Sequence, residues 1–145
     1  MIIGIDTSII VACVHVNHPM HAPAAGWLEK TFSSSDVVVA HHSVLEVYAV
    51  LARMPGDLRV EPLEARDILS TTICENSSIC GFSGNEIWDV IDFFVSIPAV
   101  GGQSYDAFII GILKKEGIRA FATFNRSHFE RLNGGIEMID PSRPY

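Results

Sequence analysis

The sequence predicts an α/β fold, a three-layer α/β/α sandwich in which a parallel sheet of roughly five strands lies between helices. Short apolar runs without charges recur along the chain, as is typical of strands buried on both faces. Helical patterns separate these runs, and strands that alternate with helices indicate a parallel sheet covered on both sides. The length of 145 residues suits one domain, expected to span residues 1–145.

The expected strands are short apolar segments bounded by polar or turn residues. They comprise residues 1–5, 37–40, 79–82, 119–124 and 136–139. The first strand stops at Asp6, which Thr7 and Ser8 follow. Because ligands gather at the carboxyl ends of strands in open α/β sheets, Asp6 is expected where chemistry takes place. The alternative is that Asp6 caps the helix that follows.

Helices are expected in each connection between strands. The first begins after Asp6, is interrupted near residues 17–19 and at Pro23, and resumes over residues 24–30. Ser104 is expected to cap a later helix that Gly117 closes. The further helices are predicted over residues 44–53, 62–74, 84–96, 105–116 and 127–132.

The composition is that of a globular protein, with 48% hydrophobic and 19% charged residues. No apolar run approaches the roughly 18–20 residues that a membrane span requires, and the N-terminus lacks the pattern of a signal peptide. The three cysteines are spaced unlike metal ligands. We therefore expect a cytoplasmic protein with buried thiols and no membrane partner.

The net charge of −7 argues against a general surface for polyanions. It leaves room for an enzyme that acts on nucleic acid, because acids gathered in one pocket attract a divalent metal that can meet a phosphate.

Glu46 can be interpreted in two ways. Ser43 and Glu46 have the spacing of a capping box, in which the glutamate folds back onto the start of its helix. However, the helix is apolar almost all round until Arg53, which predicts burial, and a buried carboxylate needs a partner or a metal. Glu46, Val50 and Arg53 fall on one stripe of this helix.

Asp106 and Asn125 repeat this situation. Asp106 lies in the first turn of a second apolar helix, where an acid also suits the helix dipole. Asn125 follows a strand, as Asp6 does, and is either a turn residue before a capping box at Ser127 and Glu130 or an oxygen donor to a metal.

Three carboxylates at strand ends or helix starts exceed what capping predicts. Together, Asp6, Glu46 and Asp106 suit Mg²⁺ or Mn²⁺, hard ions that keep water and accept phosphate oxygens. The chemistry that uses such a site is metal-assisted hydrolysis of phosphodiesters.

Four blocks of the sequence together resemble the PIN-domain family, and within it the VapC-type toxin ribonucleases of toxin–antitoxin pairs. These blocks span most of the chain in the family's order and comprise residues 3–8, 42–51, 105–110 and 122–129. The resemblance implies a five-stranded parallel sheet and Mg²⁺- or Mn²⁺-dependent cleavage of RNA. It also implies a small antitoxin whose tail covers the active-site groove, and a homodimer.

The resemblance assigns the acidic metal-binding positions to Asp6, Glu46 and Asp106. Asn125 falls where a fourth acid often stands in the family, which puts a second metal site in doubt more than the first.

Residues near these positions are candidates for supporting roles. Hydroxyl groups could hold the carboxylates or a metal-bound water through hydrogen bonds, and the candidates are Thr7, Ser8, Ser104 and Thr123. The candidates for contacts with substrate phosphates are Arg53, Arg126 and Arg131.

Other patterns have simpler explanations. His15, His18 and His21 have a spacing that suggests zinc, but Pro19 breaks the helical register between them. His41 and His42 are expected to point to opposite faces of a strand, so that they cannot share an ion.

Two other functions compete with the nuclease. One is a nucleotide-binding or phosphoacceptor regulatory domain, although the chain lacks a glycine-rich phosphate loop after its first strand. The other is an RNA- or partner-binding module without catalysis, which the neutral Asn125 suggests.

Overall fold

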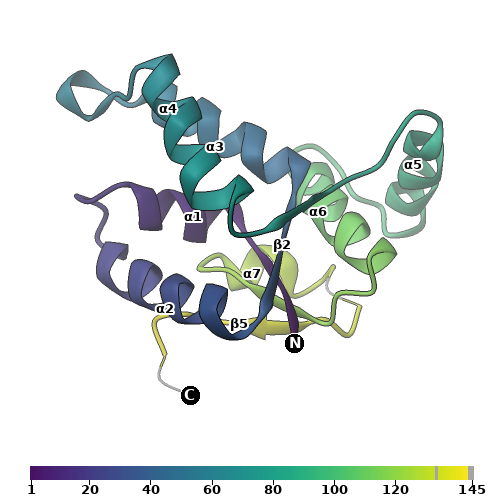
Figure 1. Ribbon diagram of the computed structural model, residues 1–145. Coiled ribbons are helices and arrows are strands. Elements are labelled where there is room, and N and C mark those ends of the chain that lie inside the picture. Colours follow the sequence, from purple (N-terminus) through teal and green to yellow (C-terminus); the bar gives the residue numbers. More distant parts are fainter. Residues whose placement is uncertain (133, 144–145) are drawn as a thin grey trace.

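A five-stranded parallel sheet runs through the computed structural model, which describes residues 1–132 and 134–143 (Figure 1). The order is β3-β2-β1-β4-β5, and every pairing between neighbours is parallel. The predicted α/β fold is thus confirmed; residues 133, 144 and 145 of the expected domain lie outside the described residues. The strands are β1 (Ile2–Ile5), β2 (Asp36–Ala40), β3 (Ser78–Cys80), β4 (Ala120–Ala122) and β5 (Glu137–Ile139).

Helices cover both faces of this sheet. The helices are α1 (Thr7–Val14), α2 (His21–Ser34), α3 (His41–Arg53), α4 (Pro62–Leu69), α5 (Glu86–Ser96), α6 (Gln103–Lys115) and α7 (Arg126–Phe129). A 3₁₀ turn, η1 (Gly56–Leu58), precedes α4, and a π-helical turn, η2 (Ser70–Cys74), follows it. Helices α4 and α5 project from the body on opposite sides (Figure 1).

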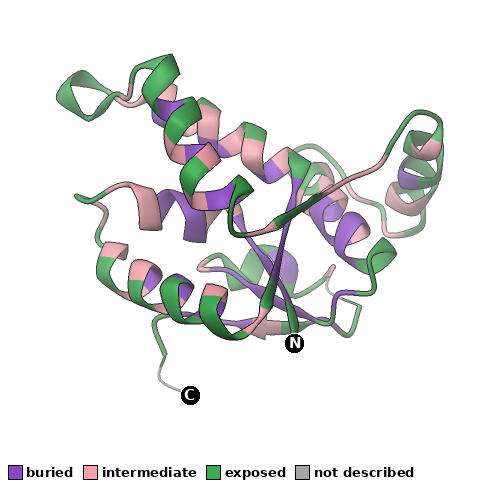
Figure 2. Ribbon diagram, in the orientation of Figure 1, coloured by how far each residue is buried: buried purple, intermediate pink, exposed green. Residues whose placement is uncertain are grey.

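The strand side chains divide between two apolar cores, because successive residues of a strand point to opposite faces. Ile3 and Ile5 face the core that α1, α2, α3 and α4 complete. Val38 and Phe121 face the core that α6 and α7 complete. The three central strands β2, β1 and β4 and the inward sides of α1 and α6 are accordingly buried, whereas the edge strand β3 and most of α4 and α5 are exposed (Figure 2).

Gly4 lets α6 approach the sheet closely. A Cβ atom at this position would lie 2.7 Å from Cδ2 of Leu113 and 3.2 Å from Cδ2 of Phe121. Both neighbours are fully packed in the second core, so any larger residue at position 4 would push α6 away from β1.

Five helix starts differ from the prediction, those of α5 at Glu86 and α7 at Arg126 by only one or two residues. Helix α2 begins at His21 and includes Pro23, because a proline in the first turn replaces no intrahelical hydrogen bond. Helix α3 begins at His41, so the expectation that His41 and His42 lie on a strand is wrong. Helix α6 begins at Gln103, and Ser104 is its second residue and makes no capping hydrogen bond.

The three cysteines are free thiols. Cys13 and Cys80 are half-buried, but Cys74 is exposed, so the expectation of buried thiols is wrong for this residue. Within the described residues, the helices are too short or too polar to cross a membrane.

Candidate active site

The order in which strands join the sheet reverses at β1, so that the carboxyl ends of β1 and β4 lie beside each other. The chain leaves β1 to form β2 on one side, whereas β4 lies on the other side. Such a switch point opens a crevice at the carboxyl ends of the two strands. Asp6 follows β1 and Thr123 follows β4, and the Asp6 N–H donates to the carbonyl of Ala122 at 3.0 Å.

The Asp6 carboxylate is buried in this crevice, with only 3% of the residue exposed. The hydroxyl of Ser8 donates to Oδ2 of Asp6 at 2.6 Å, and the hydroxyl of Thr123 donates to the same oxygen at 2.7 Å. Burial raises the pKa of Asp6, and the two hydrogen bonds oppose this shift. Asp6 is the N-cap residue of α1, but its side chain makes no well-formed capping hydrogen bond, and the nearby N–H groups of Ser8 and Thr7 lower its pKa less than the Ser8 and Thr123 hydroxyls do.

Backbone N–H groups after β4 donate hydrogen bonds to the hydroxyls of Ser8 and Thr123. The N–H of Phe124 donates to Oγ of Ser8 at 3.2 Å, and the N–H of Asn125 donates to Oγ1 of Thr123 at 2.9 Å. The hydroxyl of Thr7 is buried, and within the described residues it has no hydrogen-bond partner. The Asp6 carboxylate is therefore fixed by segments more than a hundred residues apart in the sequence.

Glu46 lies in the second turn of α3 and does not form the predicted capping box. The helix begins at His41, and the Ser43 hydroxyl is buried without a partner among the described residues. Instead, Nε2 of His42 lies 2.6 Å from Oε1 of Glu46, one helical turn away. The helix is also not buried all round: Leu45 is 64% exposed because it lines an open groove.

Asp106 lies in the first turn of α6, as predicted, and the charges of the other two acids act on its carboxylate. Burial is the main cause that raises the pKa of Asp106, and the negative charges of Asp6 and Glu46 raise it further. His128 and His42 act in the opposite direction. Nδ1 of His128 lies 3.9 Å from Oδ2 of Asp106.

A hollow of about 430 Å³ brings the predicted residues together at the carboxyl end of the sheet. Its wall includes all three acids and the exposed Asn125. The predicted supporting residues Thr7 and Ser8 line it as well. The complete set of predicted residues in this wall is Asp6, Thr7, Ser8, Glu46, Asp106 and Asn125.

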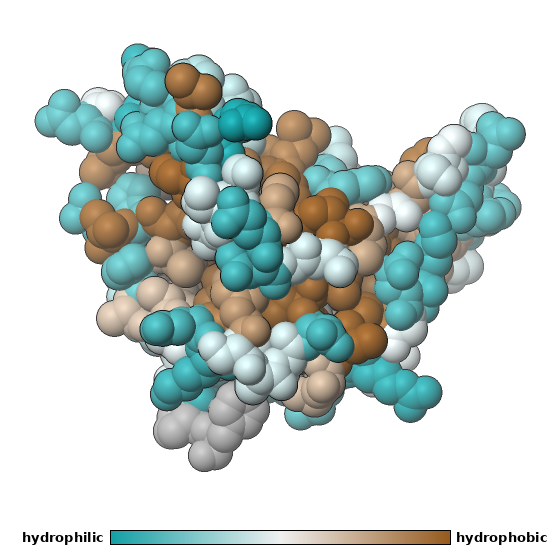
Figure 3. Space-filling view, in the orientation of Figure 1, coloured by the Kyte–Doolittle hydropathy of each residue, from teal (hydrophilic) through white to brown (hydrophobic). Residues whose placement is uncertain are grey.

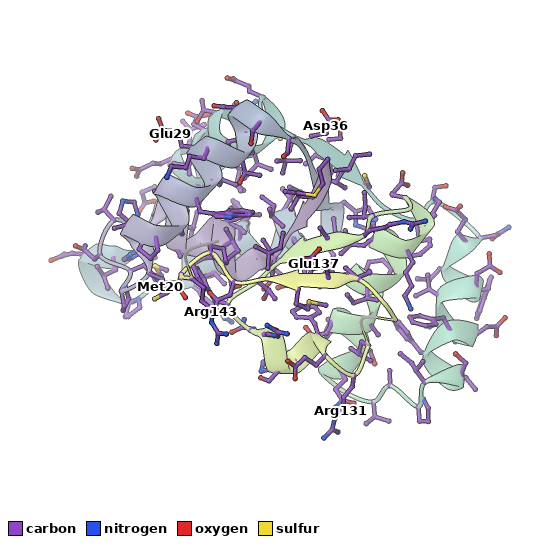
Figure 4. The ribbon with its side chains drawn as sticks, turned by 90° about the horizontal axis from the view of Figure 1, so that it is seen from below. Met20, Glu29, Asp36, Arg131, Glu137 and Arg143 are labelled. Carbon is purple, nitrogen blue, oxygen red and sulfur yellow. The ribbon has the colours of Figure 1, made fainter. Side chains whose placement is uncertain are left out.

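A larger groove of about 1580 Å³ adjoins this hollow, and Glu46 and Asp106 line both. Arg53 from α3 and Arg131 from the segment after α7 also line the groove. Figure 4 shows Arg131 at the outer edge of the molecule. Three predicted residues, Ser104, Thr123 and Arg126, are absent from the described linings of both spaces, although Thr123 holds Asp6 from behind through its hydrogen bond.

Arg126 has a different partner: its Nε lies 2.9 Å from Oε1 of Glu130, one turn further along. This ion pair replaces the capping box predicted for Ser127 and Glu130, because α7 begins at Arg126 with Asn125 before it.

The donor set fits a small divalent cation in its chemistry. Carboxylate oxygens are the ligands that Mg²⁺ and Mn²⁺ prefer, and a cation between these acids would relieve the repulsion that raises the pKa of Asp106. Across residues 1–132 and 134–143, however, no three His, Cys, Asp or Glu side chains are grouped so that they could hold a metal ion as they stand. Glu46 is engaged by His42, which leaves Asp6 and Asp106 as the better placed pair.

Two of the three spaced histidines have other partners for their rings, whereas Nδ1 of His15 is buried without a hydrogen-bond partner among the described residues. Nδ1 of His18 accepts the N–H of Met20 at 3.1 Å, and Nδ1 of His21 lies 3.0 Å from the carbonyl of Ala12. His15 is partly buried at the end of α1. These contacts join α1 to α2 and leave the zinc interpretation without support in the described part of the chain.

Sequence reasoning missed three residues that line the groove: His42, Tyr105 and His128. The spacing of His42 and Glu46, four residues apart on a helix, was a signal for the first. Tyr105 is next to Asp106 in the sequence. No local pattern indicates His128, since only the fold brings α7 to the start of α6.

Known proteins resemble the chain in sequence and in fold. A model of the PIN domain family matches residues 3–135. Ribonuclease VapC27 of Mycobacterium tuberculosis is 25% identical over 107 residues, which cover 74% of this chain and 73% of that protein. The structure of VapBC2 from Rickettsia felis, bound to a promoter DNA fragment, has a TM-score of 0.70 at 15% identity, covering 97% of this chain and 98% of that one.

A second solved structure has the same fold. VapC20 of Mycobacterium tuberculosis, described as a toxin that cleaves the sarcin-ricin loop, has a TM-score of 0.68 at 17% identity. The match covers 93% of this chain and 97% of that chain. Since the family model spans most of the sequence, this chain belongs to the PIN-domain family.

Proposed function

We propose that this protein is a divalent-metal-dependent endoribonuclease that acts as the toxin of a toxin–antitoxin pair. The observation that carries the proposal is the convergence of Asp6, Glu46 and Asp106 on one hollow at the carboxyl end of the sheet. The ribonuclease activity named for VapC27 and the RNA cleavage named for VapC20 support it.

The proposed cofactor is Mg²⁺ or Mn²⁺, held by Asp6 and Asp106. One or two carboxylates are enough for Mg²⁺, which keeps several water ligands. When bound, the ion would supply an activated water and offset charge on the phosphoryl group. Glu46 stands at the rim, where His42 holds its Oε1, and Asn125 offers an uncharged oxygen in the same wall.

The protein's own residues orient the Asp6 carboxylate and bind the substrate phosphates. Ser8 and Thr123 hold the Asp6 carboxylate in one orientation, so that little reorganisation is needed when substrate arrives. Arg53 and Arg131 bind substrate phosphates along the groove that leads to the acids. For Arg126 to make such a contact, its ion pair with Glu130 would have to open.

We further propose that a small antitoxin covers the groove with its tail and that the protein forms a homodimer. The similarity to VapBC2 supports the antitoxin.

The main alternative is a module that binds RNA or a partner without cleaving RNA. Asn125 favours it, as does the lack of a ready three-ligand metal group among the described residues.

The test is cleavage-site mapping on total cellular RNA with Mg²⁺, Mn²⁺ or EDTA. We expect the wild type to cut at defined sites only with metal, and Asp6→Asn and Asp106→Asn to cut none while remaining folded by circular dichroism. Asp92→Asn, an exposed acid of α5, is the matched control and should cut as the wild type does. Full activity in Asp6→Asn or Asp106→Asn would refute the assignment, and uncut RNA with a folded wild type would favour the alternative.

A further inference from the structure

One aromatic ring at the mouth of the large groove has no role in the chemistry described above. Tyr105, the third residue of α6, lies directly before Asp106 and is 60% exposed. Its ring is parallel to the imidazole of His42, with an interplanar angle of 4° and 5.2 Å between the ring centroids. The ring is thus held in a defined orientation although most of the residue faces solvent.

His42 is itself fixed from two further sides. Its Nε2 lies 2.6 Å from Oε1 of Glu46, and its ring meets the ring of Phe108 edge-on, at 90° and 5.6 Å between centroids. Tyr105 therefore rests on a rigid support, and its position relative to Glu46 and Asp106 is set by the same contacts.

The groove that Tyr105 lines has the composition of a site for bases rather than for phosphates alone. Aliphatic side chains make up much of its wall, and Arg53 and Arg131 are the cations that line it in the described part of the chain. Hydrophobic residues also gather between the α4 and α5 projections on the face seen in Figure 3, but that surface is not identified with the groove. The net charge of −7 weakens the general attraction for a polyanion, which makes contacts with bases a useful second source of affinity.

We propose that Tyr105, backed by His42, is the platform on which an unpaired RNA base stacks beside the scissile phosphodiester. The proposal rests on the proposed ribonuclease function and deepens it by naming a residue that would contact the substrate. In a helix the neighbouring bases cover both faces of each base, so only a splayed or single-stranded nucleotide can reach the ring. Tyr105 is thus a specificity-determining residue that receives an unpaired base next to the acids.

The test compares Tyr105→Leu with the wild type. The substrate is a single-stranded RNA that contains one mapped cleavage site, and its length of roughly 12 nucleotides is within the site sizes of proteins that bind single strands. We expect the KM in Mn²⁺ to rise roughly 5- to 100-fold, as for loss of one stacking side chain, while kcat changes less. Tyr105→Phe, which keeps the ring, should rescue the KM. Trp88→Ala removes an aromatic ring that is 66% exposed on α5, away from the residues that line the groove, and should leave the KM unchanged.

A set of RNAs with an abasic nucleotide at each position near the cut separates stacking from a structural effect. With the wild type, one abasic position should raise the KM as strongly as Tyr105→Leu does, and in Tyr105→Leu the same lesion should add nothing. Independent effects that multiply, or a KM of Tyr105→Leu within twofold of the wild type, would overturn the proposal.

The same comparison without cleavage distinguishes this proposal from the proposed function. The Kd of the labelled RNA, measured by fluorescence anisotropy in EDTA, should rise in Tyr105→Leu and recover in Tyr105→Phe. A wild type that cuts no RNA would refute the nuclease function, and the Kd values would still decide the role of Tyr105. Equal Kd values for the wild type and Tyr105→Leu would refute the stacking role alone.

Discussion

The hydrogen bond from Thr123 to Asp6 offers the sharpest test of how the site is built. Its donor and acceptor residues are 1% and 3% exposed, and the oxygens lie 2.7 Å apart. Thr123→Val keeps the branched shape and removes only the hydroxyl. Hydrogen bonds to charged groups contribute about 1.5–3 kcal/mol, and solvent screens this buried pair little. We expect Thr123→Val to lower the free energy of unfolding by at least that amount at neutral pH without metal, because the N–H of Asn125 also loses its acceptor.

Two comparisons isolate the charge of Asp6 as the cause. In the Asp6→Asn background the acceptor is neutral, so Thr123→Val should cost only about 0.5–1.5 kcal/mol. Thr31→Val is a control elsewhere in the protein: Thr31 is buried too, but its hydroxyl donates to the neutral carbonyl of Trp27 at 2.8 Å. Its cost should also be about 0.5–1.5 kcal/mol.

Urea unfolding in EDTA measures these differences, and thermal unfolding should show a fall in Tm of roughly 4–10 °C for Thr123→Val. The reasoning would be refuted by an equal cost of Thr123→Val in the wild-type and Asp6→Asn backgrounds, since the double-mutant cycle would then show no coupling.

Two further predictions concern the burial of Asp6 and of Gly4. Because burial raises the pKa of Asp6 above 3.8, its ionised form costs stability, and this cost develops as the pH rises through the raised pKa. Asp6→Asn should therefore be more stable than the metal-free wild type at neutral pH. Urea unfolding should show this difference in the free energy of unfolding vanish below about pH 3.8. A difference that persists in acid would contradict the reasoning. Gly4→Ala should lower the free energy of unfolding by about 1–3 kcal/mol, because its Cβ would lie 2.7 Å from Cδ2 of Leu113. Gly26→Ala in α2 meets no atom within 4 Å and should raise stability by about 0.4–1 kcal/mol, so equal effects of the two substitutions would count against the packing argument.

The centre of the sheet was predictable because β2, β1 and β4 are buried on both faces and each is a short apolar run. Residues 37–40 and 119–124 contain β2 and β4 for this reason. β3 was less clear in the sequence because it lies at an edge, where Ile79 is 42% exposed. The sequence predicts too late a start for α2 because Pro23 is typical of a break, although the first turn of a helix tolerates proline.

The acids were predictable from their places at the ends of strands and the starts of helices, but their partners were not. The bond between Thr123 and Asp6 joins residues 117 positions apart, and it exists only because β4 pairs with β1. Ser43 and Glu46 have the spacing of a capping box, yet the helix begins two residues before Ser43, and His42 takes Glu46 instead. Local spacing cannot distinguish these outcomes, because the start of the helix is set by where β2 ends.

The central claim is that the acids at the carboxyl end of the sheet form a site for a divalent metal, and Mn²⁺ titration by isothermal calorimetry tests it most directly. We expect saturable binding to the wild type, and its loss in Asp106→Asn and in Asp6→Asn. The control Asp92→Asn should bind Mn²⁺ as the wild type does. Undiminished Mn²⁺ binding by Asp106→Asn, or the absence of binding by the folded wild type both alone and with RNA, would contradict the claim.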